Sequence, residues 1–264
     1  MDQELRTALS DLAARPRVLV AVDFDGTLAP LVADPLQAHA VAGGLEALRD
    51  AAALAGVTAA IVSGRDLATL ELLTSIARHE GIHLIGSHGA EVTPPPGSDA
   101  PSSTAAPVDS SATSLLNTVR SELEAIRSRH PAARVEYKPT AVVLHTRGME
   151  PSAGEDARRA AQDVGVRHPE VHVLPGKEVV ELSVSPADKG TAVANLAVES
   201  RSDATLYVGD DATDERAFAA LAPTSGDVTI KVGTGTTRAL HRVADPEAVV
   251  EVLEYLIDER RLKG

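Results

Sequence analysis

The chain has 264 residues, enough for two domains, and its 44% hydrophobic and 24% charged residues are ordinary for a globular protein. It contains no cysteine, which excludes disulfides, thiolate nucleophiles and cysteine-based zinc sites. A formal charge of −13 and an aromatic content of 2% argue against nucleic acid or an anionic membrane as its partner.

The first residues show the spacing of an amphipathic helix. Leu5, Leu9 and Leu12 fall on one face of that helix. The segment lacks the pattern of a secretory leader, and no apolar run approaches the length of a membrane span. We therefore expect a cytoplasmic protein.

Short apolar runs that end in loops rich in Asp, Gly or Ser alternate with helical patterns. The runs that predict strands are Val18–Val22, Val57–Val62, His83–Ile85, Leu206–Val208 and Val228–Val232. The helical patterns are Val41–Ala55, Leu67–Arg78, Thr191–Glu199, Glu215–Leu221 and Glu247–Arg260. This alternation predicts an α/β fold with a Rossmann-like parallel sheet, whose ligands bind at the carboxyl ends of the strands.

The alternation stops in the middle of the chain. From Thr93 to Thr113 the composition turns to Pro, Ser, Thr, Ala and Gly, which indicates an exposed loop and a hinge between domains. The pattern after it predicts helix, two strands, helix and two strands, at Ser114–Arg129, Val135–Lys138, Ala141–His145, Gly154–Val166, Val171–Leu174 and Glu178–Val184. We predict a core domain in two parts, 1–107 (with the hinge at 93–107) and 185–264, and an inserted smaller α+β domain at 108–184.

Carboxylates follow the first predicted strand, in Asp23-Phe24-Asp25-Gly26-Thr27. A hairpin turn would also use Asp-Gly. A calcium loop would need Gly at its sixth position and Glu at its twelfth, where this chain has Leu28 and Asp34. The calcium interpretation fails, and the motif alone is only moderately specific.

A second group of acids follows the strand Leu206–Val208, as Asp210, Asp211, Asp214 and Glu215. Acids are common in the first turn of a helix, which explains the last two but not the first two. Four neighbouring carboxylates repel one another unless a cation lies among them. The sheet could bring Asp23, Asp25 and Asp210 together as an all-oxygen site suited to Mg²⁺.

Positive charge and hydroxyl groups stand at two further element ends. Ser63-Gly64-Arg65 follows a predicted strand, and Asp188-Lys189-Gly190-Thr191 opens a predicted helix. Each segment alone would be explained by a helix cap or a surface residue.

All four segments in this order resemble the haloacid dehalogenase superfamily of phosphotransferases, and within it the trehalose-6-phosphate phosphatases. The four superfamily motifs match Asp23-Phe24-Asp25-Gly26-Thr27, Ser63, Lys189 and Gly209-Asp210-Asp211-x-x-Asp214. The narrower resemblance adds Gly64-Arg65, Gly86-Ser87-His88-Gly89-Ala90-Glu91, Glu136-x-Lys138, Arg147, Gly176-Lys177-x-x-x-Glu181 and Lys231-Val232-Gly233-x-Gly235. In two departures, Ser183-Val184 replaces a basic residue followed by Pro, and Asp188 replaces a small polar residue.

The resemblance implies a Mg²⁺-dependent phosphatase that hydrolyses trehalose 6-phosphate through an aspartyl phosphate. It implies that Asp23 is the nucleophile and Asp25 the general acid and base, while Ser63 and Lys189 bind the phosphoryl oxygens. The metal would be held by Asp23, the backbone carbonyl of Asp25 and Asp210, with Asp214 orienting a metal-bound water or Lys189 and Asp211 assisting.

The resemblance also implies that the inserted domain is a cap that recognises the sugar. Its matching positions are Glu136, Lys138, Arg147, Lys177 and Glu181. Arg65 would contribute from the core, and His88 fits a turn or core residue as well as it fits a substrate ligand.

Two other functions stay open. The protein could act on another sugar phosphate, such as mannosyl-3-phosphoglycerate, glucosylglycerol phosphate or a sugar monophosphate. It could instead be a silent phosphosugar-binding module, but such a module would be expected to lose the nucleophile or a metal acid, and both are present. The cap positions favour trehalose 6-phosphate, and we expect a monomer without nucleic-acid or membrane partners.

Overall fold

The computed structural model describes residues 1–32, 34–77, 80–94, 110–176, 178–221 and 225–263. The chain divides into two compact units, one of Met1–Thr104 with Ala187–Gly264 and one of Ala105–Pro186. The predicted boundaries of the inserted domain, 108 and 184, stay predictions, and the first of them lies outside the described residues.

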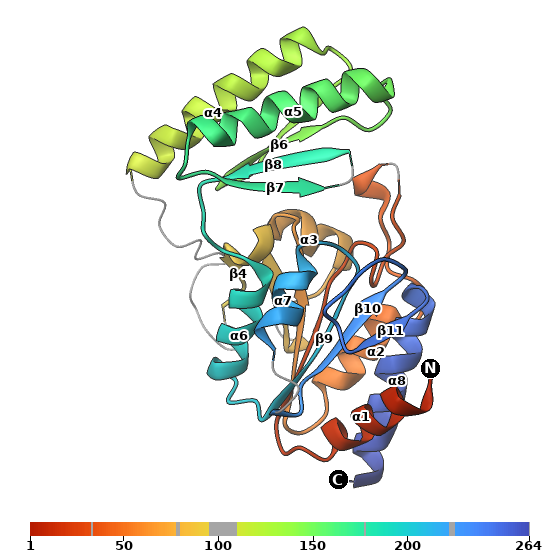
Figure 1. Ribbon diagram of the computed structural model, residues 1–264. Helices are drawn as coiled ribbons and strands as arrows, with labels where there is room; N and C mark the ends of the chain where they lie inside the picture. Colours follow the sequence, from red (N-terminus) through yellow and green to blue (C-terminus); the bar gives the residue numbers. More distant parts are fainter. Residues whose placement is uncertain (33, 78–79, 95–109, 177, 222–224, 264) are drawn as a thin grey trace. The chain divides into compact units, whose positions relative to one another are not determined.

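The larger unit is built on a seven-stranded sheet with the order β11-β10-β9-β1-β2-β3-β4 (Figure 1). Its strands are β1 (Val18–Val22), β2 (Val57–Val62), β3 (Ile82–Gly86), β4 (Glu91–Val92), β9 (Ala204–Gly209), β10 (Val228–Val232) and β11 (His241–Val243). All neighbouring strands are parallel except β3 and β4. The central strands β1 and β9 are buried along their whole length, as expected for a sheet that is covered on both faces.

Helices cover the two faces of this sheet. They are α1 (Gln3–Ala13), α2 (Gly44–Ala52), α3 (Leu67–Thr74), α6 (Lys189–Glu199), α7 (Asp214–Ala220) and α8 (Pro246–Lys263). Val18, Val20 and Val22 of β1 share a core cluster with α1, α2 and α8. The alternate residues Leu19 and Ala21 share another with α6 and α7, so the pleat of β1 separates two helical layers.

The five predicted strands of this sheet are confirmed, but two short elements were missed. β4 has two residues and β11 has three, too few for an alternating pattern to show. The helix predicted over Leu67–Arg78 ends at Thr74, because Ser75 takes a left-handed backbone conformation with φ of 51° and closes the last turn.

The smaller unit is an antiparallel sheet with the order β5-β6-β8-β7, covered on one face by two helices (Figure 1). Its elements are α4 (Ser110–Arg129), β5 (Arg134–Tyr137), β6 (Ala141–His145), α5 (Pro151–Arg167), β7 (His172–Gly176) and β8 (Val179–Ser183). Val142, Leu144 and Val180 pack against the helices. Because side chains alternate along a strand, the residues between them point to the opposite face.

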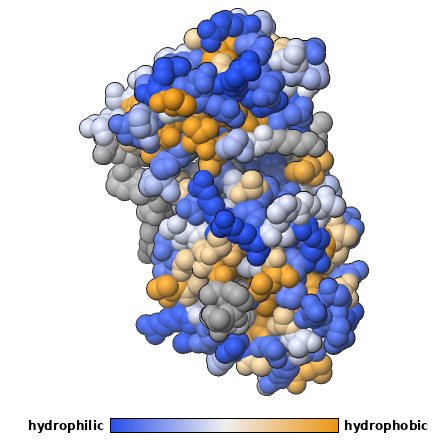
Figure 2. Space-filling view, in the orientation of Figure 1, coloured by the Kyte–Doolittle hydropathy of each residue, from blue (hydrophilic) through white to orange (hydrophobic). Residues whose placement is uncertain are grey.

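The solvent-facing side of the two helices of the smaller unit is polar. Figure 2 shows mostly hydrophilic side chains on the outward side of α4 and α5. Among the helices that the structure describes, none is both long enough and apolar enough to cross a membrane.

The docking of α1 can be tested through Leu9, which is fully buried in the core shared with α8. Leu9→Ala should lower the free energy of unfolding by about 2–5 kcal/mol, because it removes apolar contacts and leaves a cavity. Thr7→Ala, at an exposed position of the same helix, should change it by less than about 0.5 kcal/mol. Urea denaturation measures both, and equal effects would show that α1 is not part of the core.

Candidate active site

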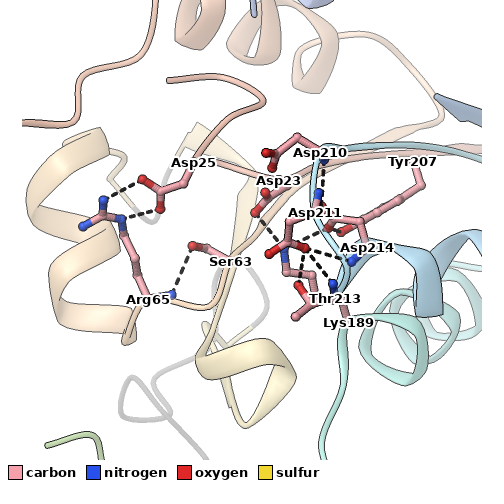
Figure 3. Close-up of polar contacts among 10 residues, drawn as sticks. All are labelled: Asp23, Asp25, Ser63, Arg65, Lys189, Tyr207, Asp210, Asp211, Thr213 and Asp214. Carbon is pink, nitrogen blue, oxygen red and sulfur yellow. Dashed lines mark hydrogen bonds and ion pairs between the residues drawn. The ribbon is translucent and has the colours of Figure 1, made fainter. Parts of the chain in front are cut away.

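Three carboxylates meet at the carboxyl ends of two neighbouring strands. Asp23 follows β1, Asp210 follows β9, and Asp214 is the first residue of α7. One oxygen of each lies within 4.8 Å of the others (Figure 3). The parallel register of β1 and β9 pairs Val22 with Val208, so the residues after both strands emerge at the same edge.

Lys189 neutralises part of this cluster. Its Nζ lies 2.9 Å from Oδ1 of Asp23 and 2.8 Å from Oδ1 of Asp214. It is the first residue of α6, and the carboxylate of Asp188 caps that helix by accepting a hydrogen bond from the Thr191 amide. Burial works to lower the pKa of Lys189, but the charges of Asp214 and Asp23 outweigh it and hold the pKa well above its usual range. The ammonium group is therefore a permanent positive charge beside Asp23.

Asp214 is fully buried and accepts four hydrogen bonds. Its Oδ1 accepts from Lys189 and, at 2.7 Å, from the Tyr207 hydroxyl. Its Oδ2 accepts from the amides of Asp210 and Asp211, at 2.8 and 2.9 Å. Two oxygens with four donors have little capacity left for a direct bond to a cation, so the geometry favours an organising role for Asp214.

Asp210 has the opposite property. Its Oδ1 is buried and has no hydrogen-bond partner among the described residues. Burial, together with repulsion from Asp211 and Asp214, raises the pKa of Asp210 to about 7. Burial likewise raises the pKa of Asp23 well above its usual range, although Lys189 opposes the shift. A divalent cation with oxygen ligands would relieve both the missing partner and the repulsion, so these residues fit such an ion.

Gly26 leaves the space that Asp210 occupies. A Cβ at Gly26 would lie 2.2 Å from Oδ2 of Asp210, and the φ of Gly26 is +79°. Only glycine combines that conformation with so close an approach.

Asp211 stabilises the loop between β9 and α7. Its Oδ1 accepts hydrogen bonds from the amide and hydroxyl of Thr213 and from the amide of Asp214. Burial works to raise the pKa of Asp211, but the charge of Lys189 and these hydrogen bonds outweigh it and hold the pKa below its usual range.

Asp25 is not one of the three clustered carboxylates. The expected group was Asp23, Asp25 and Asp210, whereas the third side chain brought into it is that of Asp214. Both oxygens of Asp25 instead accept hydrogen bonds from Arg65, each at 2.6 Å (Figure 3). A guanidinium group offers two parallel donors to one carboxylate, which explains why the Asp25 side chain turns toward Arg65.

Ser63 and His88 lie beside Arg65. Ser63 follows β2 and is buried, and its Oγ accepts a hydrogen bond from the Arg65 amide at 3.1 Å. The amide of His88 donates to the Ser63 carbonyl at 3.0 Å. A Cβ at Gly64 would lie 2.5 Å from the His88 ring. The structure thus brings His88 against the Ser63–Arg65 segment.

In the smaller unit, three of the predicted sugar-recognition residues share one sheet face. Val143 of β6 pairs with Glu136 on one side and Glu181 on the other, so these residues point away from α4 and α5. Lys138 lies 2.6 Å from Glu181, between Nζ and Oε2. Glu136 contacts His145 at 2.7 Å, and this hydrogen bond is the main cause that lowers the pKa of Glu136.

Arg147 and Lys177 are the other two predicted sugar-recognition residues of the smaller unit. Arg147 lies in the loop after β6, with its Nε 3.7 Å from Oε2 of Glu178. Lys177 lies outside the described residues.

Sequence reasoning missed His145 and Tyr207, which contact Glu136 and Asp214 respectively. It quoted Lys231 within a matching segment but gave it no role, and this residue contacts the Asp210 carbonyl. All three lie in predicted strands. For Tyr207 and Lys231, the available signal was a polar group inside a run that otherwise predicts a buried strand.

An open pocket of about 810 Å³ lies elsewhere in the larger unit, lined by α6, α7 and residues 236–238. None of Asp23, Asp210 and Asp214 lines it. The chemistry of the acidic cluster, rather than the size of this pocket, therefore identifies the candidate active site.

Comparisons with known proteins agree with this geometry. A family model described as trehalose-phosphatase matches residues 21–247. A trehalose-phosphate phosphatase of Mycolicibacterium paratuberculosis is 35% identical over 97% of this chain and 66% of its own length, and one of Mycobacterium marinum is 35% identical over 94% and 64%. This chain thus spans about two thirds of the length of these curated relatives.

The fold has a counterpart in the C-terminal domain of C. albicans trehalose-6-phosphate phosphatase, with a TM-score of 0.82, 24% identity and 96% of each chain covered. The expected α/β fold is confirmed.

The metal-free protein should lose stability as the pH rises from about 4 to about 7. Asp210 has its pKa raised from 3.8 to about 7 on folding, so the unfolded chain ionises first and rising pH favours it. At about 1.4 kcal/mol per pKa unit, the loss should be on the order of a few kcal/mol.

Denaturant unfolding in EDTA across this pH range measures the loss. Asp210→Asn should flatten the profile. Mg²⁺ should stabilise the parent more at pH 8 than at pH 5, because protons compete for the same oxygens. A parent whose stability rises over this window would contradict the assignment.

Proposed function

Because this chain belongs to the trehalose-phosphatase family, we propose that it hydrolyses trehalose 6-phosphate to trehalose and inorganic phosphate, a step of trehalose biosynthesis. The observation that carries the proposal is the buried Asp23 carboxylate, which is paired with Lys189 and lies in the cluster with Asp210 and Asp214. Mg²⁺ as the cation, a cytoplasmic location and a monomeric chain are parts of the same proposal.

Asp23 is the nucleophile in this proposal. The oxygen of Asp23 that does not face Lys189 attacks phosphorus, the bond from phosphorus to the sugar oxygen breaks, and an aspartyl phosphate forms. Lys189 fixes the other oxygen of Asp23 and offsets negative charge that gathers on the transferring group. The alcohol of Ser63 lies at the neighbouring strand end, from which it donates to a phosphoryl oxygen.

Asp25 acts as the general acid and then as the general base in this proposal. It gives a proton to the leaving sugar oxygen and later takes one from the water that hydrolyses the aspartyl phosphate, which restores Asp23 and releases phosphate. The ion pair between Asp25 and Arg65 supports a mechanism in which substrate binding makes Asp25 available for proton transfer. A phosphorylated substrate competes for the guanidinium group and so frees the Asp25 carboxylate.

A bound Mg²⁺ would be held by Asp23, Asp210 and the Asp25 carbonyl, and it would neutralise charge on the phosphoryl oxygens. Two observations support this set of ligands: Oδ1 of Asp210 has no hydrogen-bond partner among the described residues, and the carboxylates of Asp211 and Asp214 repel that of Asp210.

Sugar recognition is assigned to the smaller unit. Glu136 and Glu181 present carboxylate oxygens that suit sugar hydroxyls, and Lys138 suits the phosphate. Their position on one sheet face supports this assignment. Another sugar phosphate remains the second candidate, because these groups would also recognise a different polyol ester.

Asp23→Asn should abolish phosphate release from trehalose 6-phosphate while the fold survives, since the substitution keeps the shape of the side chain and removes the nucleophile. Asp50→Asn, an exposed acid on α2, should retain the parent rate. Phosphate release measures both, and circular dichroism checks folding. Parent-like turnover by folded Asp23→Asn would rule out the aspartyl-phosphate mechanism.

Glu136→Ala and Glu181→Ala should reduce kcat/KM for trehalose 6-phosphate by tenfold or more each, since a hydrogen bond to a charged group contributes about 1.5–3 kcal/mol. Both should largely spare p-nitrophenyl phosphate, which has no sugar and a better leaving group. Glu155→Ala, on the exposed surface of α5, is the matched control.

Two outcomes would count against this assignment. An equal loss on the two substrates would mean that the residues serve the fold or the chemistry. Unchanged rates on both would mean that the unit recognises a different sugar, and a panel of sugar phosphates would then identify it.

A further inference from the structure

Lys231 is a buried lysine to which the proposed mechanism gives no role. It belongs to β10, where all five residues are buried, and its own exposed fraction is 6%. Among the described residues it forms no ion pair with a carboxylate. An ammonium group taken out of water needs polar partners or a nearby opposite charge, and the charge of Lys231 does act on the Asp210 carboxylate.

Those partners are two backbone carbonyls at the strand ends. The Nζ of Lys231 donates to the carbonyl of Asp210 and, at 2.9 Å, to the carbonyl of Val232. The register places Lys231 beside Gly209, the residue before Asp210. The side chain of Lys231 thus ties the end of β10 to the start of the acidic loop.

The backbone of Asp210 is held on both sides by buried charged groups. Its carbonyl accepts from Lys231, and its amide donates to Asp214 at 2.8 Å. The side chain, in contrast, keeps one buried oxygen without a partner and lies over the bare Cα of Gly26. The backbone is fixed while the carboxylate is left available.

We propose that Lys231 is a positioning residue that aims the Asp210 carboxylate at a divalent cation. The inference rests on the proposed function only for the presence of that cation. Ligands whose orientation is fixed by outer partners bind metal more tightly, and loss of such a partner typically weakens metal binding by about 10–100-fold.

Whether the loss of Lys231 weakens or strengthens cation binding distinguishes a positioning role from a purely electrostatic one. Lys231 carries a positive charge close to a cation site, so removing that charge alone should strengthen cation binding. Removing the contact that orients Asp210 should weaken it. A purely structural role would lower the melting temperature and leave the affinity unchanged.

The test is titration calorimetry of Mg²⁺ into metal-free parent, Lys231→Met and Arg238→Met. Methionine extends as far as the Cε of lysine but has no charge and no donor. Arg238 follows the same strand, is exposed and forms no ion pair among the described residues, so its variant removes one charge and leaves the Asp210 carbonyl bonded.

We expect Lys231→Met to raise the Kd for Mg²⁺ by about tenfold or more. Arg238→Met should stay within about twofold of the parent. Thermal unfolding in EDTA confirms that each variant is folded. In an Asp210→Ala background, Lys231→Met should no longer weaken Mg²⁺ binding, because no carboxylate is left to aim and only the loss of a positive charge remains.

An equal or lower Kd for Lys231→Met than for the parent would overturn the inference and leave the proposed function intact. A parent that binds no Mg²⁺ would overturn both. If Lys231→Met does not fold, Lys231→Leu replaces it, since leucine likewise has neither a charge nor a hydrogen-bond donor. A parent-like Kd for that variant would equally overturn the inference.

Discussion

The buried carboxylate of Asp214 is the interaction on which the rest of the site depends. It joins β9 through Tyr207, the acidic loop through two amides, and α6 through Lys189. A buried carboxylate is stable only when its oxygens are satisfied. Each of these elements must therefore reach its native position for the others to be stable. Lys189 extends this network to Asp23, with which it forms an ion pair.

The positive side chains at the site do not fully neutralise its carboxylates. Lys189 serves two carboxylates at once, Arg65 serves Asp25, and Lys231 contacts carbonyls rather than an acid. Burial is the main cause of the raised pKa values of Asp23 and Asp210, and repulsion from the neighbouring carboxylates adds to it. A divalent cation among these carboxylates would offset the repulsion, which the proposed binding of an anionic substrate requires.

Much of this architecture follows from the sequence, because it depends on short-range pattern. Apolar runs that end in acids predict β1 and β9, and parallel strands bring those ends to one edge. The resemblance names Glu136 and Glu181 as sugar-recognition residues, whereas their shared sheet face follows only from the register of β5, β6 and β8. What the sequence could not supply is side-chain direction.

The pairing of Asp25 with Arg65 depends on how one turn orients a carboxylate, and no spacing rule encodes that. Tyr207 and Lys231 have the periodicity of strand residues, so their contacts with Asp214 and Asp210 emerge only once β9, β10 and α7 are packed. Lys138 meets Glu181 through β6, whose strand register the pattern alone does not fix.

The position of β1 between β2 and β9 also has a kinetic consequence. β2 follows β1 closely in the chain, whereas β9 comes only after the whole smaller unit. During synthesis β1 therefore has one edge unpaired until the last part of the larger unit emerges, and pairing it closes a long loop. Folding should be slow for the length of the chain, as for other folds dominated by distant contacts. A nascent chain that ends before β9 would carry Asp23 and Lys189 but not the acidic loop, and the edge of β1 that pairs with β9 would stay exposed.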